Sequence, residues 1–370
     1  MKVLFCSPYV DSKAYAGGGI TQWGKYIVSY WKTEGRKDDV ELIPVSFDRH
    51  QLITEGTTLI SRIRWGIKDQ CRSIMTAIGC MRDEKPEVIH ICTSASLGLL
   101  KDLVLLYVAK QRKVKSVLHL HFGRVPVIIK QDKWEWKLLK IAFRLADRVV
   151  AMNRPTYIAV KEQKLCDIRY LPNPLDLSIV TLAEKLKLEV KREPRRLIFV
   201  GHVYKTKGVV ELVKACSALN NIQLRIIGKY DAEMKNELFR IARVKDSGCW
   251  LEMLGEVSHE LVIRELLEAD ILVFPSYSEG FPNVILEAMV CGCAIASSNV
   301  GAIPEMLDVE NDACGVCFAP RDTMAVQKAV TKLLESPELK ECMVSKAYKR
   351  VMSQYSMPMV WKQLVNVWQG

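Results

Sequence analysis

Short apolar runs alternate with longer segments of helical periodicity over the whole chain. The runs are rich in Val, Ile and Leu, as in buried strands, and the segments between them space apolar residues as in helices that pack on a sheet. Such alternation is typical of a parallel sheet covered by helices. The predicted strands cover residues 3–7, 40–47, 88–92, 116–121, 148–152, 168–171, 197–200, 223–227, 251–254, 271–274, 294–297 and 315–318. The predicted helices include 20–32, 59–82, 98–111, 134–146, 208–219, 231–245, 259–268, 283–291 and 322–335.

The alternation lapses in one polar and basic stretch, which ends near Pro194. We therefore predict a first domain over residues 1–175, a linker over 176–196 and a second domain over 197–355, followed by a terminal helix at 356–370. The expected fold class is α/β, with two Rossmann-like doubly wound domains facing across a cleft. Ligands of such sheets bind outside the carboxyl ends of the strands.

Composition narrows the class of protein. The chain has 370 residues, enough for two domains, and lacks both a signal-peptide pattern and an apolar run long enough to span a bilayer. Its 12 cysteines are scattered, which indicates a reducing compartment and not a disulfide framework. A cytoplasmic location is therefore expected.

The net charge of +11 is concentrated in one segment. Residues 112–148 hold ten Lys or Arg and three acids, a net charge of +7. A basic surface suits an anionic membrane, a nucleic acid or a diphosphate, and is equally consistent with a solvated face. Within this segment, residues 134–144 read either as a helix in a membrane interface or as a core-facing helix with a basic outer face. Peripheral contact with the inner face of the membrane is thus one option.

The stretch from 269 to 305 carries the clearest chemistry. An apolar strand, a loop of small and polar residues and a short helix ending at Gly292 follow one another. This layout presents backbone N–H groups to an anion. Glu279 and Glu287 bracket the loop and the first turns of the helix, with seven residues between them. Both carboxylates can face a ligand held at the helix N-terminus.

This stretch resembles the retaining GT-B glycosyltransferases of glycosyltransferase family 4, whose E-x7-E motif lies in a longer pattern. The matching residues are Pro275, Ser276, Glu279, Gly280, Phe281, Pro282, Leu286, Glu287, Ala288, Met289, Gly292, Ser298, Gly301, Pro304 and Glu305. Cys293 departs from the pattern, which usually has Pro there. The resemblance implies the GT-B fold, with the last helix packed back on the first domain.

Further segments match the family and imply contacts to the donor. Gly17, Gly18 and Gly19 stand where the family's first-domain loop faces the diphosphate. Lys207 and Gly208 match its Lys-Gly pair, whereas His202 stands where Arg is usual and Lys205 is a candidate to compensate. Gly255, Glu256 and Val257 are expected to flank the base.

Two histidines end a strand of the first domain. The side chains of His119 and His121 are expected on the same face of that strand, so a metal is conceivable, but the sequence offers no evident third ligand. The resemblance places His121 near the donor sugar and the acceptor. We therefore expect no metal and no other cofactor.

The resulting hypothesis is a retaining hexosyl- or N-acetylhexosaminyl-transferase that uses a UDP- or GDP-sugar and a glycan, glycolipid or polyprenyl-linked acceptor. His121, Lys207 and Glu279 are the expected catalytic residues. The resemblance adds Gly280, Phe281, Pro282, Asn283, Val284 and Glu287 to the donor contacts. Two alternatives remain at this point: a nucleotide-sugar epimerase of the same fold, and a basic nucleic-acid-binding protein, for which no recognition motif is present.

Overall fold

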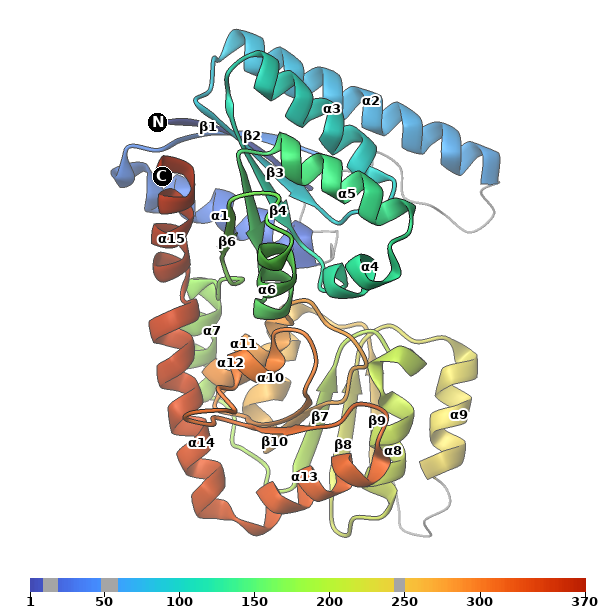
Figure 1. Cartoon of the computed structure of the whole chain (residues 1–370). Coiled ribbons are helices and arrows are strands. Elements are labelled where there is room, and N and C mark those ends of the chain that lie inside the picture. Colours follow the sequence, from blue (N-terminus) through green and yellow to red (C-terminus); the bar gives the residue numbers. More distant parts are fainter. Residues whose placement is uncertain (9–18, 48–58, 243–249) are drawn as a thin grey trace. The chain divides into compact units, whose positions relative to one another are not determined.

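The computed structural model describes residues 1–8, 19–47, 59–242 and 250–370. It divides into two compact units (Figure 1). The first consists of Met1–Pro174 together with Met357–Gly370, and the second of Leu175–Ser356. None of the helices in the described part is long and apolar enough to cross a membrane.

The first unit is built on a six-stranded, wholly parallel sheet of order β2-β1-β3-β4-β5-β6. Its strands are β1 (Lys2–Ser7), β2 (Glu41–Ser46), β3 (Val88–Thr93), β4 (Lys115–Leu120), β5 (Arg148–Ala151) and β6 (Ile168–Tyr170). Its helices include α1 (Gly19–Thr33), α2 (Leu59–Asp83), α3 (Gly98–Gln111), α4 (Val125–Gln131), α5 (Trp134–Leu145), α6 (Arg154–Glu162) and α15 (Met357–Gln369). Strands β3 and β5 are buried along their whole length, as expected for a sheet covered on both faces.

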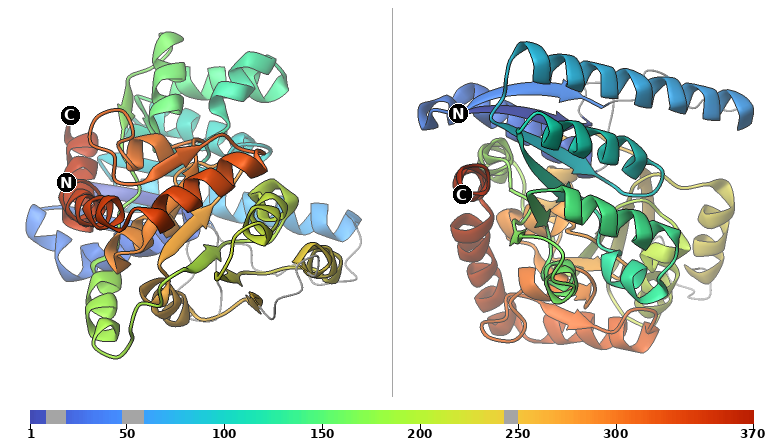
Figure 2. Two further views of the ribbon diagram at one scale, coloured as in Figure 1. Left: turned by 90° about the horizontal axis from the view of Figure 1, so that it is seen from below. Right: turned by 45° about the horizontal axis from the view of Figure 1, so that its top comes forward.

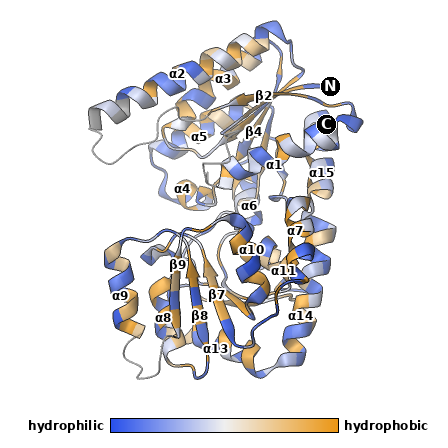
Figure 3. Cartoon of the chain, turned by 180° about the vertical axis from the view of Figure 1, so that it is seen from behind, coloured by the Kyte–Doolittle hydropathy of each residue, from blue (hydrophilic) through white to orange (hydrophobic). Residues whose placement is uncertain are grey.

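The second unit repeats this architecture with the order β12-β11-β10-β7-β8-β9. Strands β7, β8 and β9 can be seen side by side in Figure 3. Its strands are β7 (Arg196–Val200), β8 (Gln223–Ile227), β9 (Leu251–Gly255), β10 (Ile271–Phe274), β11 (Ala294–Ser298) and β12 (Val316–Phe318). Its helices include α7 (Leu177–Lys187), α8 (Val209–Ser217), α9 (Ala232–Ala242), α10 (His259–Glu268), α11 (Asn283–Cys291), α12 (Ile303–Met306), α13 (Thr323–Glu335) and α14 (Pro337–Arg350). The strand order reverses between β7 and β10, so a ligand is expected at the carboxyl ends of these two strands.

These sheets confirm the predicted α/β fold class with two Rossmann-like domains. The segment 176–196, expected to be a linker, contains helix α7 and lies within the second unit. Asp176 caps this helix, accepting a hydrogen bond from the Ser178 N–H at 2.8 Å. The helix was not predicted because polar residues alternate with its apolar ones. Its buried face is formed by Ile179, Val180, Ala183 and Leu186.

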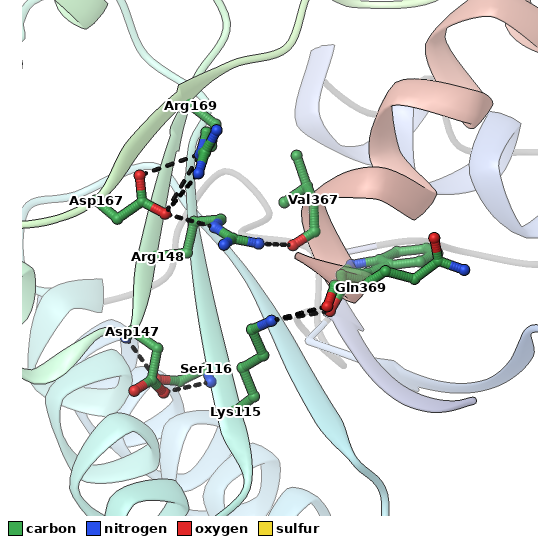
Figure 4. A network of polar contacts seen from close by, with 9 residues as sticks. Lys115, Ser116, Asp147, Arg148, Asp167, Arg169, Val367 and Gln369 are labelled. Atoms are coloured by element: carbon green, nitrogen blue, oxygen red, sulfur yellow. Dashed lines mark hydrogen bonds and ion pairs between the residues drawn. The ribbon is translucent and has the colours of Figure 1, made fainter.

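Cations of the first unit hold the carboxyl end of α15 (Figure 4). Lys115 Nζ donates to the carbonyl oxygens of Trp368 and Gln369 at 3.3 and 3.4 Å. Arg148 donates to the Val367 carbonyl and also pairs with Asp167 at 2.9 Å. The last carbonyls of a helix have no partner within the helix, and positive charge stabilises this end. Helix α15 is therefore fixed to the amino ends of β4 and β5 by charge as well as by its buried face.

Candidate functional site

The loop of the second unit that contains Glu279 lies where the strand order reverses. Strand β10 ends at Phe274, the loop follows, and α11 begins at Asn283 with no side-chain cap. Two glycines allow neighbouring turns to pack on the loop. A Cβ on Gly208 would lie 2.1 Å from the Pro275 carbonyl oxygen, and a Cβ on Gly301 would lie 2.2 Å from that of Glu279. Both glycines have positive φ, so other residues would also be strained there.

Lys207 and Glu279 meet at this edge. Lys207 ends the short helical turn Lys205–Lys207 that follows β7, and its Nζ lies 2.5 Å from Glu279 Oε1 in the loop after β10. Both side chains are mostly buried, with 26% and 12% of their surfaces exposed. The structure thus brings together two of the three residues that the sequence analysis expects to be catalytic. Each holds the other in a defined position at the switch point of the sheet.

Glu287 has a partner that the sequence analysis missed. Its side chain points from α11 toward His259, and His259 Nε2 lies 2.9 Å from Glu287 Oε1. His259 is the first residue of α10, whose N-cap Ser258 accepts a hydrogen bond from the Leu261 N–H at 3.3 Å. The hydrogen bond to Glu287 raises the pKa of His259, while burial opposes this rise. No spacing or motif in the sequence indicated this pair.

The other two candidate cations after β7 take different positions. Lys205 is exposed and pairs with Glu237 of α9 at 3.1 Å. His202 is exposed as well, and its ring stacks on that of Tyr204 with centroids 5.7 Å apart. Among the predicted cations of this turn, only Lys207 contacts a residue of the Glu279 loop in the contacts described. Lys205 in this structure therefore does not replace the missing arginine beside that loop.

The remaining predicted donor contacts are distributed around the same edge. Phe281 and Pro282 are buried, and the Phe281 ring packs on Tyr355 with centroids 5.6 Å apart. Asn283 and Val284 are half-buried in the first turn of α11, after Gly280, whose carbonyl accepts a hydrogen bond from the Ala302 N–H.

The predicted base-binding segment follows β9. Gly255 has a φ of +74°, and its carbonyl accepts a hydrogen bond from the Gly228 N–H at 2.8 Å. Glu256 is exposed and Val257 is half-buried. These three residues therefore lie at the carboxyl end of a strand of the same sheet as Lys207, as a ligand-binding turn requires.

In the first unit, only part of the predicted site is described. Gly17 and Gly18 lie outside the described residues, and Gly19 begins helix α1. His121 follows β4, and its ring lies over that of His119 with centroids 4.0 Å apart. Burial lowers the pKa of His121 to about 3, with a further contribution from His90. His121 is therefore a neutral imidazole, and its Nε2 has no hydrogen-bond partner within the described structure.

A buried chain of hydrogen bonds stands behind His121. Trp368 Nε1 of α15 lies 3.0 Å from His90 Nδ1, and His90 Nε2 lies 3.3 Å from His119 Nδ1. An indole N–H can only donate, so His90 Nδ1 must accept and the His90 proton must be on Nε2. His90 then donates to His119 Nδ1, which leaves the His119 proton on Nε2. The bond from Trp368 thereby fixes the tautomers of both histidines.

The same proton assignment bears on a metal site. His90, Cys92 and His119 offer ligand atoms within 4.8 Å of one another, so a third ligand that the sequence did not reveal lies near His119. However, a His90 Nε2 that carries a proton has no lone pair for a metal. Burial also raises the pKa of the Cys92 thiol, which disfavours the thiolate that a metal binds. The donor set therefore does not fit a metal while Trp368 is in place.

Comparison with known proteins extends these observations. Residues 182–350, most of the second unit, match the family model described as Glycosyl transferases group 1. A protein of Bacillus subtilis named as a teichuronic acid biosynthesis glycosyltransferase is 25% identical over 281 residues, which cover 74% of this chain and 68% of that protein. The chain spans about half the length of the next curated relatives.

Solved structures match over the whole chain. A sucrose-phosphate synthase of Thermosynechococcus elongatus superimposes with a TM-score of 0.73 at 18% identity, covering 100% of this chain and 98% of that one. HepE of Anabaena, solved with UDP, superimposes with a TM-score of 0.69 at 16% identity over 99% of both chains. At these identities the structural likeness shows the GT-B fold, and the family match relates most of the second unit to Glycosyl transferases group 1.

Proposed function

We propose that this glycosyltransferase moves a sugar from a nucleotide diphosphate sugar to a glycan, glycolipid or polyprenyl-linked acceptor with retention of the anomeric configuration. The observation that carries the proposal is the Lys207–Glu279 pair at the switch point between β7 and β10. Relatives named for teichuronic acid and capsular polysaccharide biosynthesis support a role in surface polysaccharide or glycoconjugate synthesis. The E-x7-E pattern supports placement in family 4, and within that family a hexosyl- or N-acetylhexosaminyl-transferase.

Lys207 is proposed to neutralise the leaving diphosphate. Its ammonium group is a compact charge on a flexible stem, and in this structure Glu279 holds it at the end of the sheet. When the bond to the sugar breaks, negative charge develops on the diphosphate, and a cation already in position stabilises that change. The N-terminus of α11 lies in the same loop–helix segment and adds a partial positive charge. Because a carboxylate has two oxygens, Glu279 can pair with Lys207 and also accept hydrogen bonds from the sugar hydroxyls. The backbone from Gly280 to Asn283 is proposed to contact the sugar as well.

Glu287 is proposed to accept hydrogen bonds from the ribose hydroxyls. One of its oxygens already meets His259, which fixes the orientation of the carboxylate. A carboxylate has two oxygens and about four acceptor positions, so His259 and a ribose can be accommodated together. HepE of Anabaena was solved with UDP and with UDP-glucose, which favours a uridine nucleotide over GDP for this chain.

Retention is proposed because the charged groups are gathered at the leaving group. An inverting enzyme requires a base opposite the leaving group. The candidate in the first unit, His121, is a neutral side chain expected near the sugar and acceptor. In the retaining route, the departing phosphate oxygen takes the proton of the acceptor hydroxyl as the new glycosidic bond forms.

No divalent ion is needed in this account, because Lys207 and the α11 N-terminus face the diphosphate. A cytoplasmic site of action, with peripheral membrane contact, is part of the same proposal.

A panel of UDP- and GDP-sugars tests the proposal. Binding is scored by thermal shift, and diphosphate release is then measured with candidate acceptors, with and without EDTA. We expect one nucleotide sugar to stabilise the protein, and acceptor-dependent release to survive EDTA. Conversion of the donor to an epimer without acceptor would identify an epimerase instead. Loss of turnover in EDTA with recovery in Mg²⁺ or Mn²⁺ would contradict the metal-independent account. A salt-sensitive gel shift without sugar transfer would favour the nucleic-acid-binding alternative.

A further inference from the structure

Helix α3 is apolar on its outer face as well as its inner one. Leu99, Leu105, Leu106 and Ala109 face the core. On the opposite side, Leu97, Leu100, Val104 and Tyr107 recur at helical spacing, and between 42% and 72% of each of these residues is exposed. A helix that is hydrophobic all round is normally covered on every side. Exposed apolar residues that adjoin one another mark a contact surface.

Helix α5 extends this outer face. It packs beside α3 on the same side of the sheet (Figures 1 and 2). One reading of residues 134–144 was a helix in a membrane interface. In the structure, most of its apolar residues belong to the core, because Trp136, Leu139 and Phe143 are buried. Only Trp134 and Ile141 of its large apolar residues remain well exposed, at 52% and 46%. We call the six exposed residues the α3–α5 surface: Leu97, Leu100, Val104, Tyr107, Trp134 and Ile141.

Most of the exposed charges on and beside these two helices are positive. Within α3 and α5, both described in full, the exposed charged side chains are Lys110, Lys137 and Arg144, with Lys140 partly exposed. Arg112 and Lys113 follow α3 and are exposed as well. The two acidic residues of these helices are shielded from solvent. Asp102 is buried and paired with Lys101, and Glu135 is mostly buried and paired with Arg124. Within the two helices the exposed charges are thus all positive, and the exposed Asp132, which precedes α5, is paired with Lys140 at 3.6 Å.

We infer that the α3–α5 surface docks on an anionic lipid bilayer. The apolar side chains enter the interface, Trp134 and Tyr107 suit the boundary between lipid and water, and the surrounding lysines and arginines meet the negative headgroups. A second copy of the chain is a poorer partner, because two such surfaces would bring like charges together. The inference concerns binding and does not depend on the proposed sugar transfer, although a bilayer would also present a lipid-linked acceptor.

Flotation with vesicles tests this inference. The whole protein is mixed with vesicles of phosphatidylglycerol and phosphatidylcholine, or of phosphatidylcholine alone. The test variant is Leu100→Gln/Val104→Gln/Tyr107→Gln, and the matched control is Leu188→Gln/Met324→Gln, which changes exposed apolar residues of the second unit. We expect the wild type and the control to bind the anionic vesicles, and the test variant to lose about tenfold or more in partition coefficient. Salt should weaken binding of the wild type.

The remaining outcomes are decisive as well. Equal partition of the test variant and the wild type, or no binding of the wild type at low salt, would overturn the inference. A wild-type dimer in sedimentation velocity that the test variant abolishes would assign the surface to self-association instead. Thermal unfolding and UDP affinity of the test variant should match those of the wild type, since the altered residues are exposed and none belongs to the donor site. A loss of sugar transfer in soluble assays would concern the proposed function and not this surface.

Discussion

Lys207 Nζ and Glu279 Oε1 lie 2.5 Å apart although 72 positions separate the two residues in the chain. They come together because β7 and β10 are neighbours in the sheet, and each residue follows one of these strands. The pair marks the place where the strand order reverses. It therefore links the fold of the second unit directly to the proposed chemistry at the diphosphate.

Replacing Lys207 should impair the chemical step more than donor binding. Lys207→Ala removes a charge that matters most as the diphosphate leaves, so turnover should fall by on the order of 10²-fold. Donor affinity should fall less. Steady-state rates and calorimetry on the same preparations separate the two effects. Lys205→Ala is the matched control, since Lys205 pairs with Glu237 and should change turnover little. A Lys207→Ala enzyme with normal turnover would remove this residue from the mechanism.

Glu287 should determine nucleotide affinity. Its hydrogen bonds to ribose hydroxyls are charge-assisted, worth roughly 1.5–3 kcal/mol, so Glu287→Ala should weaken UDP binding about tenfold or more. Isothermal titration calorimetry measures this directly. Glu260→Gln, an exposed change on the neighbouring helix α10, provides the control. Unchanged affinity in folded Glu287→Ala protein would falsify the ribose role.

His259 should titrate above the ordinary range of histidine. The hydrogen bond to Glu287 raises its pKa and burial lowers it, so Glu287→Gln should bring the pKa down. A raised pKa in the folded state stabilises the fold below the unfolded pKa, near 6.5, and this contribution is lost as the pH rises through the folded value. The wild type should therefore exceed His259→Gln in stability more at pH 6 than at pH 8. The difference should be at most about 1 kcal/mol, because His259 is half exposed.

Histidine NMR provides the measurement for His259, with His259→Gln to assign its signals. If the His259 signals titrate at the same pH with and without Glu287, the contact is not formed in solution.

Three histidines of the first unit, His90, His119 and His121, should make the protein sensitive to acid. Burial lowers the pKa of His90 and of His121 to about 3, and lowers that of His119 well below its ordinary value. The unfolded chain binds protons at these sites below pH 6.5 while the folded chain does not. Each histidine should thus reduce the free energy of unfolding by up to about 1.4 kcal/mol per pH unit as the pH falls from 6.5.

Urea unfolding at pH 7, 6 and 5 measures this loss, and imidazole NMR signals identify its source. Neutral ring signals for all three residues at pH 5 are expected. Protonation of these rings in the folded protein near pH 6.5 would show that the buried hydrogen-bond chain from Trp368 is wrong.

Much of the secondary structure could be predicted because the strands are short continuous apolar runs. Each predicted strand overlaps an observed one, and α11 has the predicted bounds. Local chemistry also accounts for helix ends, and Gly292 was predicted to end its helix. Asp322 caps α13 by accepting from the Ala325 N–H at 2.9 Å, and Gly292 ends α11 with a φ of +66°. These features depend on neighbours in sequence, which a pattern can show. The prediction failed for α7, where the charged residues Glu184, Lys185 and Lys187 near its end led into a polar and basic stretch and the apolar stripe was not recognised.

The contacts within the site could not be predicted in the same way. The motif identified Lys207, Glu279 and Glu287 by resemblance, but the pairing of Lys207 with Glu279 depends on strand order. The contact of Trp368 with His90 joins residues 278 positions apart, and His259 belongs to no pattern that distinguishes it from a surface histidine. The exposed apolar face of α3 could not be predicted either, because periodicity does not show which side of an apolar helix is exposed to solvent.

The stereochemistry of the first product tests the central claim most directly. Once the donor panel identifies a nucleotide sugar and an acceptor, proton NMR during the first turnovers reports the anomeric coupling of the transferred sugar. If the groups around Lys207 support attack from the face of the leaving diphosphate, the product keeps the donor's configuration. An inverted coupling in the first-formed product would contradict the retaining glycosyltransferase proposed here.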